Sequence, residues 1–193
     1  MSISRTILIK LLFIFLLGLS SLASARELEG VKIDDVMQVG NTTLQLNGAG
    51  LRKKLIFKVY VGALYLVEQK HTAAAILADA GQKRLTIHLL RDLSSEQLQE
   101  AFNKGLSANN TPDELVALEG KIKEFLSIFR SSGEIAKGGL ITLDFIPGEG
   151  TRISINGAEK AHIAGAEFSR ALLKIWLGED PADESLKKGL TGN

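Results

Sequence analysis

Residues 55–67 form a long apolar stretch in which every odd position from 55 to 63 is hydrophobic. The even positions mix Lys58, Tyr60 and Gly62 with further aliphatic side chains. An apolar period of two over this length is typical of a β-strand with one buried face. Such a strand needs partners in a sheet and a layer that covers its apolar face, so the rest of the chain must supply both.

The partner strands are predicted from shorter segments with the same pattern. Residues 140–146 and 152–155 flank the turn sequence Pro147-Gly148-Glu149-Gly150 and predict a hairpin. Gly48-Ala49-Gly50 is interpreted as turn punctuation between the first strand and the long apolar stretch. The other predicted strands are residues 42–46, 84–90 and, after the turn signal Asn156-Gly157, the short segment 161–163.

Three helices are predicted in the middle and at the end of the chain. The first begins at Ser94, which is followed by apolar residues at helical spacing. The second begins at Thr111-Pro112 and is expected to continue as one helix to Phe129. The third carries Phe168 to Trp176 and ends near Gly178. Each presents one apolar stripe that a sheet or another helix must cover.

Strands early in the chain and helices later favour an α+β fold, with a large antiparallel sheet and a layer of helices on one face. No repeat, low-complexity tract or linker divides the chain. We therefore expect a single domain over residues 26–193, a length that is ample for a sizeable core.

The first 25 residues have the pattern of a cleaved signal peptide. Arg5 and Lys10 form a basic start, residues 11–19 are almost all apolar, and Ala23-Ser24-Ala25 provides a small-residue cleavage site. The apolar run is nearer ten residues than the roughly twenty that span a bilayer, which disfavours the alternative of a retained anchor. Export to the periplasm is predicted.

Composition excludes several classes of function. The chain has no cysteine, so disulfides, thiolate metal sites and a cysteine nucleophile are ruled out. His71, His88 and His162 lack metal-ligand spacing, and His88 is interpreted as a structural histidine with its hydrogen bonds satisfied. No serine-hydrolase elbow or phosphate-binding loop is present. The formal charge is +1, or near −1 without residues 1–25, with no concentrated basic stripe for nucleic acid.

Arg52 and Tyr60 are the candidate binding residues, because they are polar groups within a mostly apolar segment. An arginine beside an apolar surface can hold a carboxylate with two parallel hydrogen bonds, and a tyrosine hydroxyl can donate a third. The alternative is that Arg52 is a solvated charge beside Lys53 and Lys54, and that Tyr60 is a half-buried core aromatic.

Several motifs resemble the chalcone isomerase-like family and recur in that family's order over nearly all of residues 26–193. They are Gly48-Ala49-Gly50-Leu51-Arg52, Lys58-Val59-Tyr60-Val61-Gly62, Pro147-Gly148-Glu149-Gly150-Thr151, and Leu172-Leu173-Lys174-Ile175-Trp176-Leu177-Gly178 after Phe168. The resemblance implies a large antiparallel sheet, a helical layer and a ligand cleft between them. In the plant enzymes this cleft closes a chalcone into a flavanone. Non-catalytic relatives bind fatty acids and hold the carboxylate with an arginine and a tyrosine.

Position by position, the resemblance favours binding over catalysis. The family's cleft arginine falls on Arg52, whereas the catalytic threonine falls on Tyr60. The catalytic tyrosine falls on Ser94, and a cleft asparagine falls on Ala101. Three of the four positions that serve cyclisation have therefore changed, and Tyr60 is the residue type used by the fatty-acid-binding branch.

The leading hypothesis is a periplasmic, non-catalytic protein that binds a fatty acid or a similar small hydrophobic carboxylate through Arg52 and Tyr60. One alternative is an isomerase (an intramolecular lyase of the chalcone isomerase type) on an unknown substrate, with Arg52 stabilising developing negative charge. Another is a structural or partner-binding protein whose own side chains fill the cleft. We expect no cofactor, metal or nucleic acid, and a monomer.

One geometric condition applies to the pairing of Arg52 with Tyr60. In a single straight strand the eight steps between them would span about 26 Å, at roughly 3.3 Å per residue. Side chains so far apart cannot hold one carboxylate. The chain must therefore bulge or turn near Lys53-Lys54 if both residues serve one site.

Signal-peptide cleavage is predicted after Ala25, which gives an exported protein that begins at Arg26. N-terminal sequencing or intact-mass measurement of the exported protein tests this. Retention of residues 1–25 would instead indicate a membrane-anchored protein.

Overall fold

The computed structural model describes residues 25–193. The predicted signal peptide, residues 1–25, lies outside this range apart from Ala25, with which the first strand begins. Within the described range, no helix is both long enough and apolar enough to cross a membrane.

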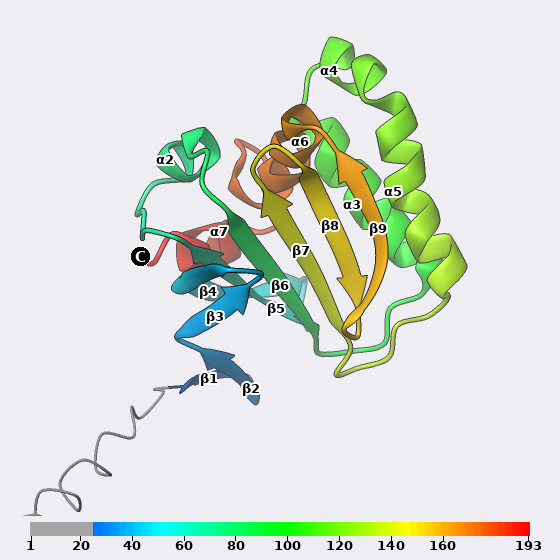
Figure 1. The fold of residues 1–193 in the computed structure, drawn as a ribbon. Helices are drawn as coiled ribbons and strands as arrows, with labels where there is room; N and C mark the ends of the chain where they lie inside the picture. Colours follow the sequence, from blue (N-terminus) through cyan, green and yellow to red (C-terminus); the bar gives the residue numbers. More distant parts are fainter. Residues whose placement is uncertain (1–24) are drawn as a thin grey trace, which may run out of the picture.

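Seven antiparallel strands form the main sheet, and each strand pairs with the next in the chain from β3 to β9 (Figure 1). A separate two-stranded hairpin, β1 and β2, precedes them. The strands are β1 (Ala25–Leu28), β2 (Val31–Asp34), β3 (Val36–Val39), β4 (Thr42–Lys54), β5 (Phe57–Leu66), β6 (Lys83–Leu89), β7 (Leu140–Ile146), β8 (Gly150–Ile155) and β9 (Ala158–Ala164).

The described residues also form six helices, of which α3, α5 and α6 pack together across one face of the sheet (Figure 1). The large hydrophobic core lies between these helices and the sheet. The helices are α2 (Ala73–Ala78), α3 (Ser95–Asn109), α4 (Pro112–Ala117), α5 (Glu119–Ser132), α6 (Ala166–Leu177) and α7 (Glu184–Leu190). The predicted α+β architecture, an antiparallel sheet with a helical layer, is confirmed.

A second, smaller core lies on the other face of β4 and β5. Leu44, Val61 and Tyr65 are fully or almost fully buried there, and residues of the β1–β2 hairpin, among them Ile33, belong to the same cluster. As a result β5 is buried on both faces from Val59 onward. The prediction of one buried face was wrong, because the sequence pattern did not reveal this hairpin as a second cover.

The strand predicted from the apolar stretch also begins too early. Leu55 and Ile56 form a two-residue turn between β4 and β5, and both side chains are exposed. The other predicted strands are confirmed within a few residues of their ends, although β4 extends to Lys54 and β9 is longer than expected. Pairing with β3, β5 and β8 supplies the backbone hydrogen bonds that extend these strands past their apolar patterns.

Gly48-Ala49-Gly50 is not a turn, contrary to the prediction, but lies inside β4. Helix α7 crosses the strand here. A Cβ at Gly48 would overlap the carbonyl oxygen of Gly189, and one at Gly50 would lie 3.1 Å from Leu186. The glycines are therefore required by close approach between helix and strand rather than by chain reversal.

Helix α3 begins as predicted, with Ser94 as N-cap in a reciprocal capping box with Gln97. Helix α6 ends before Gly178, also as predicted. The expected single helix from Thr111 to Phe129 is instead divided into α4 and α5 at Leu118, which leaves helical geometry at φ −103° and ψ 4°. Its apolar stripe is nevertheless confirmed, because Leu118 itself turns into the core.

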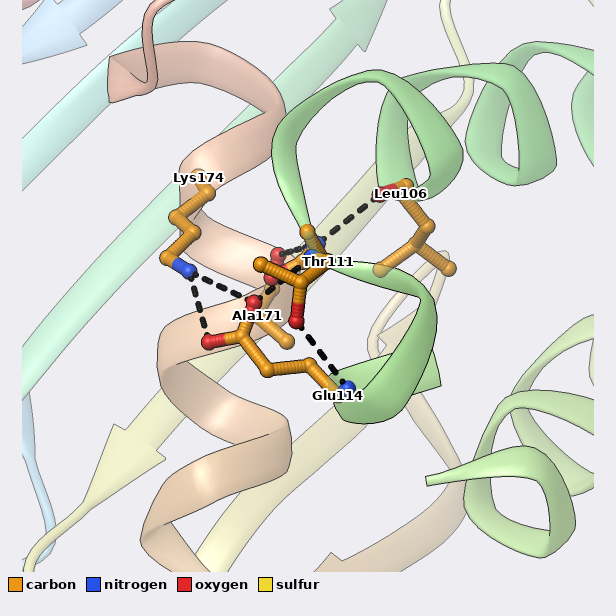
Figure 2. Close-up of polar contacts among 6 residues, drawn as sticks. Leu106, Thr111, Glu114, Ala171 and Lys174 are labelled. Atoms are coloured by element: carbon orange, nitrogen blue, oxygen red, sulfur yellow. Dashed lines mark hydrogen bonds and ion pairs between the residues drawn. The ribbon is translucent and has the colours of Figure 1, made fainter. Parts of the chain in front are cut away.

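Polar contacts at the α3–α4 junction connect the helical layer (Figure 2). The amide of Asn110 donates to the carbonyl oxygens of Leu106, at 2.9 Å, and Ala171, at 3.3 Å. Thr111 and Glu114 form the capping box of α4, and Lys174 Nζ donates to Glu114 Oε1 at 3.0 Å. These contacts attach the start of α4 to α6, the helix that carries Trp176.

Gly48→Ala is expected to lower the free energy of unfolding by about 1–3 kcal/mol, because the added methyl group must push α7 away from β4. Chemical denaturation of the purified variant measures this. Gly120→Ala is the matched control: a Cβ there meets nothing within 4 Å, and the position lies in α5. That variant should be neutral or more stable by up to about 1 kcal/mol. Equal stability of both variants would contradict the close packing of α7.

Candidate functional site

A cleft of about 510 Å³ opens between the sheet and the helical layer, within the size range of small-molecule sites. Most of its wall is apolar. The sheet and the turn before β5 contribute one side, and α3 and the end of α6 contribute the other. Residues 180–182, after α6, also line the cleft. Apolar lining residues include Val59, Ile87, Leu89, Leu98, Phe102 and Ile175.

Arg52 and Tyr60 meet in this cleft. The turn at Leu55-Ile56 reverses the chain, and Arg52 pairs directly with Tyr60 across β4 and β5. A register shift follows Arg52, where Lys53 pairs with Lys58. The Arg52 guanidinium carbon lies 5.4 Å from the centre of the Tyr60 ring. The turn and the bulge thus satisfy the geometric condition that the sequence imposed on this pair.

The Tyr60 hydroxyl is held by Trp176, whose indole Nε1 donates to it at 2.7 Å. Both side chains are buried, with exposed fractions of 6% and 2%. Burial raises the pKa of Tyr60, although the Arg52 charge and the Trp176 hydrogen bond oppose that shift. The phenol therefore stays protonated at neutral pH. Because it already accepts from Trp176, its own proton remains available to an acceptor in the cleft.

Arg52 provides the second donor. Its Nε is buried and has no hydrogen-bond partner among residues 25–193. A buried donor without a partner costs free energy, which an anion placed beside it would recover. An arginine and a protonated tyrosine on the wall of an apolar cleft are suited to receive a carboxylate. The Arg52 residue remains partly exposed, and only its Nε is both buried and unpartnered within residues 25–193.

Sequence reasoning missed Asp183, which anchors the bulge beside Arg52. Its Oδ2 accepts from the backbone N–H of Lys53 at 2.9 Å, and its Oδ1 accepts from Leu186 N at 3.0 Å, as the N-cap of α7. Burial alone would raise its pKa, but hydrogen bonds from Ser185, Lys53 and Leu186 outweigh burial and lower it. The only available signal was the pattern Asp183-Glu184-Ser185 after Pro181, a weak helix start.

Trp176 was predicted only as a core residue of the third helix, and its indole N–H gives it a second role at the site. It is the one tryptophan of the chain, but nothing in the local sequence indicates its partner. Helix α6 places it opposite β5, 116 positions from Tyr60.

The two other positions assigned by resemblance differ in whether they line the cleft. Ser94 is the N-cap of α3, where its hydroxyl accepts from Gln97 N at 3.3 Å, and it does not line the cleft. Ala101 does line the cleft but offers only a methyl group. His88 lies half-buried in β6, where burial lowers its pKa, and neither of its ring nitrogens is among the buried, unpartnered polar atoms of residues 25–193. Over residues 25–193, no three His, Asp or Glu side chains gather to hold a metal ion.

Comparison with known proteins agrees with this architecture. The crystal structure of a fatty-acid binding protein from Arabidopsis thaliana has the same fold, with a TM-score of 0.65 and 17% sequence identity over 87% of this chain and 96% of that one. None of the curated protein sequences matches the chain. The model of the chalcone isomerase-like family matches residues 25–192. This match spans almost the whole described structure, and the chain therefore belongs to the chalcone isomerase-like family.

Proposed function

We propose that this protein is an exported, non-catalytic binding protein for a fatty acid or a similar small hydrophobic carboxylate. The supporting observation is the pair of donors in the apolar cleft, the unpartnered Arg52 Nε and the protonated Tyr60 hydroxyl. Apolar walls suit the hydrocarbon part of such a ligand, and the two donors suit its carboxylate. The Arabidopsis neighbour, a fatty-acid binding protein, is consistent with this proposal.

The open volume of the cleft argues against the alternative in which the protein's own side chains fill it. The isomerase alternative lacks support from the lining. Cyclisation of a chalcone requires positioned groups that orient a ketone and a phenolate, and Ser94 and Ala101 supply none to the cleft. Binding therefore explains the retained donors better than catalysis does.

Arg52→Ala should weaken fatty-acid binding roughly ten- to a hundredfold, because it removes a charged hydrogen bond of about 1.5–3 kcal/mol. Arg52→Lys should recover only part of this affinity, since an ammonium group lacks the planar fork of donors. The ligand-free variant should keep its stability, because the Nε of Arg52 has no hydrogen-bond partner in the described part of the chain that its removal would strand. Titration with a fluorescent fatty acid and thermal melts measure the two quantities.

Arg84→Ala is the matched control. Arg84 donates to both carboxylate oxygens of the buried Asp144, at 2.6 and 2.8 Å, and does not line the cleft. Breaking that pair should cost about 2–3 kcal/mol of stability while the folded variant keeps its affinity. Unchanged affinity in Arg52→Ala would overturn the site assignment.

Chalcone cyclisation should be absent or barely above the uncatalysed rate. Loss of a positioned proton-transfer group or hydrogen-bond donor typically costs a factor of about a hundred or more. Absorbance assays on a panel of chalcones test this expectation. Flavanone formation at enzyme-like rates would replace the binding proposal with the isomerase alternative.

A further inference from the structure

The tip of the β4–β5 hairpin, residues 53–57, exposes three consecutive large apolar side chains. Leu55 is 88% exposed, Ile56 86% and Phe57 52%. Half of the large hydrophobic residues that are exposed in residues 25–193 lie at this one tip. Single exposed apolar residues are ordinary, whereas three adjacent ones at an exposed turn indicate a surface that meets an apolar partner.

The requirements of folding do not explain why large apolar residues occupy this turn. Leu55 has φ of +57°, a region in which bulky side chains are strained and which glycine or asparagine usually occupies in a tight hairpin turn. A leucine there stabilises neither the turn nor the core, because its side chain is exposed. Backbone strain retained at an exposed position is a reason to look for function.

Positive charge surrounds the apolar tip. Lys53, Lys54 and Arg91 are all exposed, and the Arg91 guanidinium carbon lies 5.2 Å from the centre of the Phe57 ring. Lys58 is also close but pairs with Glu29 at 2.6 Å. Residues 26–193 carry a formal charge near −1, so this concentration of cations is local. Its complement is an anionic surface.

The hairpin tip also forms the mouth of the cleft. Lys53, Lys54, Leu55 and Phe57 belong to its lining, together with Arg52 and Arg91. Glu100 and Asp180 are the acidic residues of the lining, against five basic ones. Ile56 is the tip residue that does not line the cleft, so its side chain faces outward only.

We propose that the hairpin tip docks on an anionic lipid bilayer, with Leu55, Ile56 and Phe57 inserted at the headgroup–acyl boundary and Lys53, Lys54 and Arg91 on the lipid phosphates. An apolar anchor or a basic patch alone binds weakly, and the two together give reversible attachment. In this orientation the mouth of the cleft faces the acyl chains. The role given to membrane docking rests on the proposed binding function. Attachment to the bilayer itself requires no ligand in the cleft.

Flotation with vesicles tests attachment. The test protein is residues 26–193, which contain the whole sheet and both hydrophobic cores. It should bind phosphatidylcholine vesicles that contain phosphatidylglycerol, bind pure phosphatidylcholine vesicles much less, and dissociate at high salt. Equal binding to both vesicle types, or to neither, would overturn the proposal.

Ile56→Ser should lower the vesicle partition coefficient about tenfold, because the transfer of one large aliphatic side chain out of water is lost. Leu55→Asn should lower it similarly and fold well, since asparagine tolerates a positive φ. Lys53→Gln and Lys54→Gln should each weaken binding to anionic vesicles roughly fivefold. The matched controls are Val116→Ser, at an apolar residue 77% exposed on α4, and the exposed pair Lys137→Gln with Lys160→Gln. Controls that lose as much binding as the tip variants would contradict the proposal.

Two further measurements separate this proposal from others. In solution without vesicles, Ile56→Ser should keep wild-type affinity for the fatty-acid probe, whereas Arg52→Ala should lose that affinity yet still float with vesicles. Failure of the fatty-acid titration alone would therefore affect only the proposed ligand. Sedimentation that shows a dimer of the wild type, converted to a monomer by Ile56→Ser, would identify a second copy as the partner and overturn membrane docking.

Discussion

Antiparallel pairing of β4 with β5 determines where the candidate binding residues of this protein lie. The pairing begins at a two-residue turn, passes a bulge after Arg52, and continues to Gln45 opposite Leu66. It brings Arg52 opposite Tyr60 and places the exposed tip at the cleft mouth. A slip of one residue would turn every side chain of one strand to the other face, and would separate the two donors. The register is therefore a condition for the site as well as for the core.

Packing on both faces maintains that register. On one face α7 lies against the glycines of β4, and Asp183 accepts from Lys53 N at the bulge. On the other face Ile33 of the β1–β2 hairpin packs in one buried cluster with Val61 and Tyr65. A strand pair buried on both sides cannot shift without exposing apolar surface at one of them. The bulge can thus present Arg52 in a fixed direction, although its Nε has no hydrogen-bond partner within residues 25–193.

The cleft combines a mostly apolar wall with the Arg52 and Tyr60 donors, and this balance supports the proposed binding function. Trp176 uses its N–H to orient the Tyr60 hydroxyl rather than to contact solvent. Burial keeps the phenol protonated, so it can donate but does not serve as an anion. Groups that would transfer a proton to a bound chalcone are lacking at Ser94 and Ala101. These features support the proposed binding of a carboxylate.

The sequence alone determined the fold class and most strand and helix positions, because period-two and helical patterns are local and the family motifs are nearly contiguous. It also proposed Arg52 and Tyr60 as the candidate binding pair. The sequence also required a bulge or turn near Lys53-Lys54 if Arg52 and Tyr60 serve one site. Only the tertiary structure decided that the turn lies at Leu55-Ile56, that Gly48-Ala49-Gly50 belongs to a strand under α7, and that Trp176 and Asp183 support the site. The turn depends on the register of β4 against β5. The other two features depend on contacts between residues more than a hundred positions apart, which no local sequence pattern reveals.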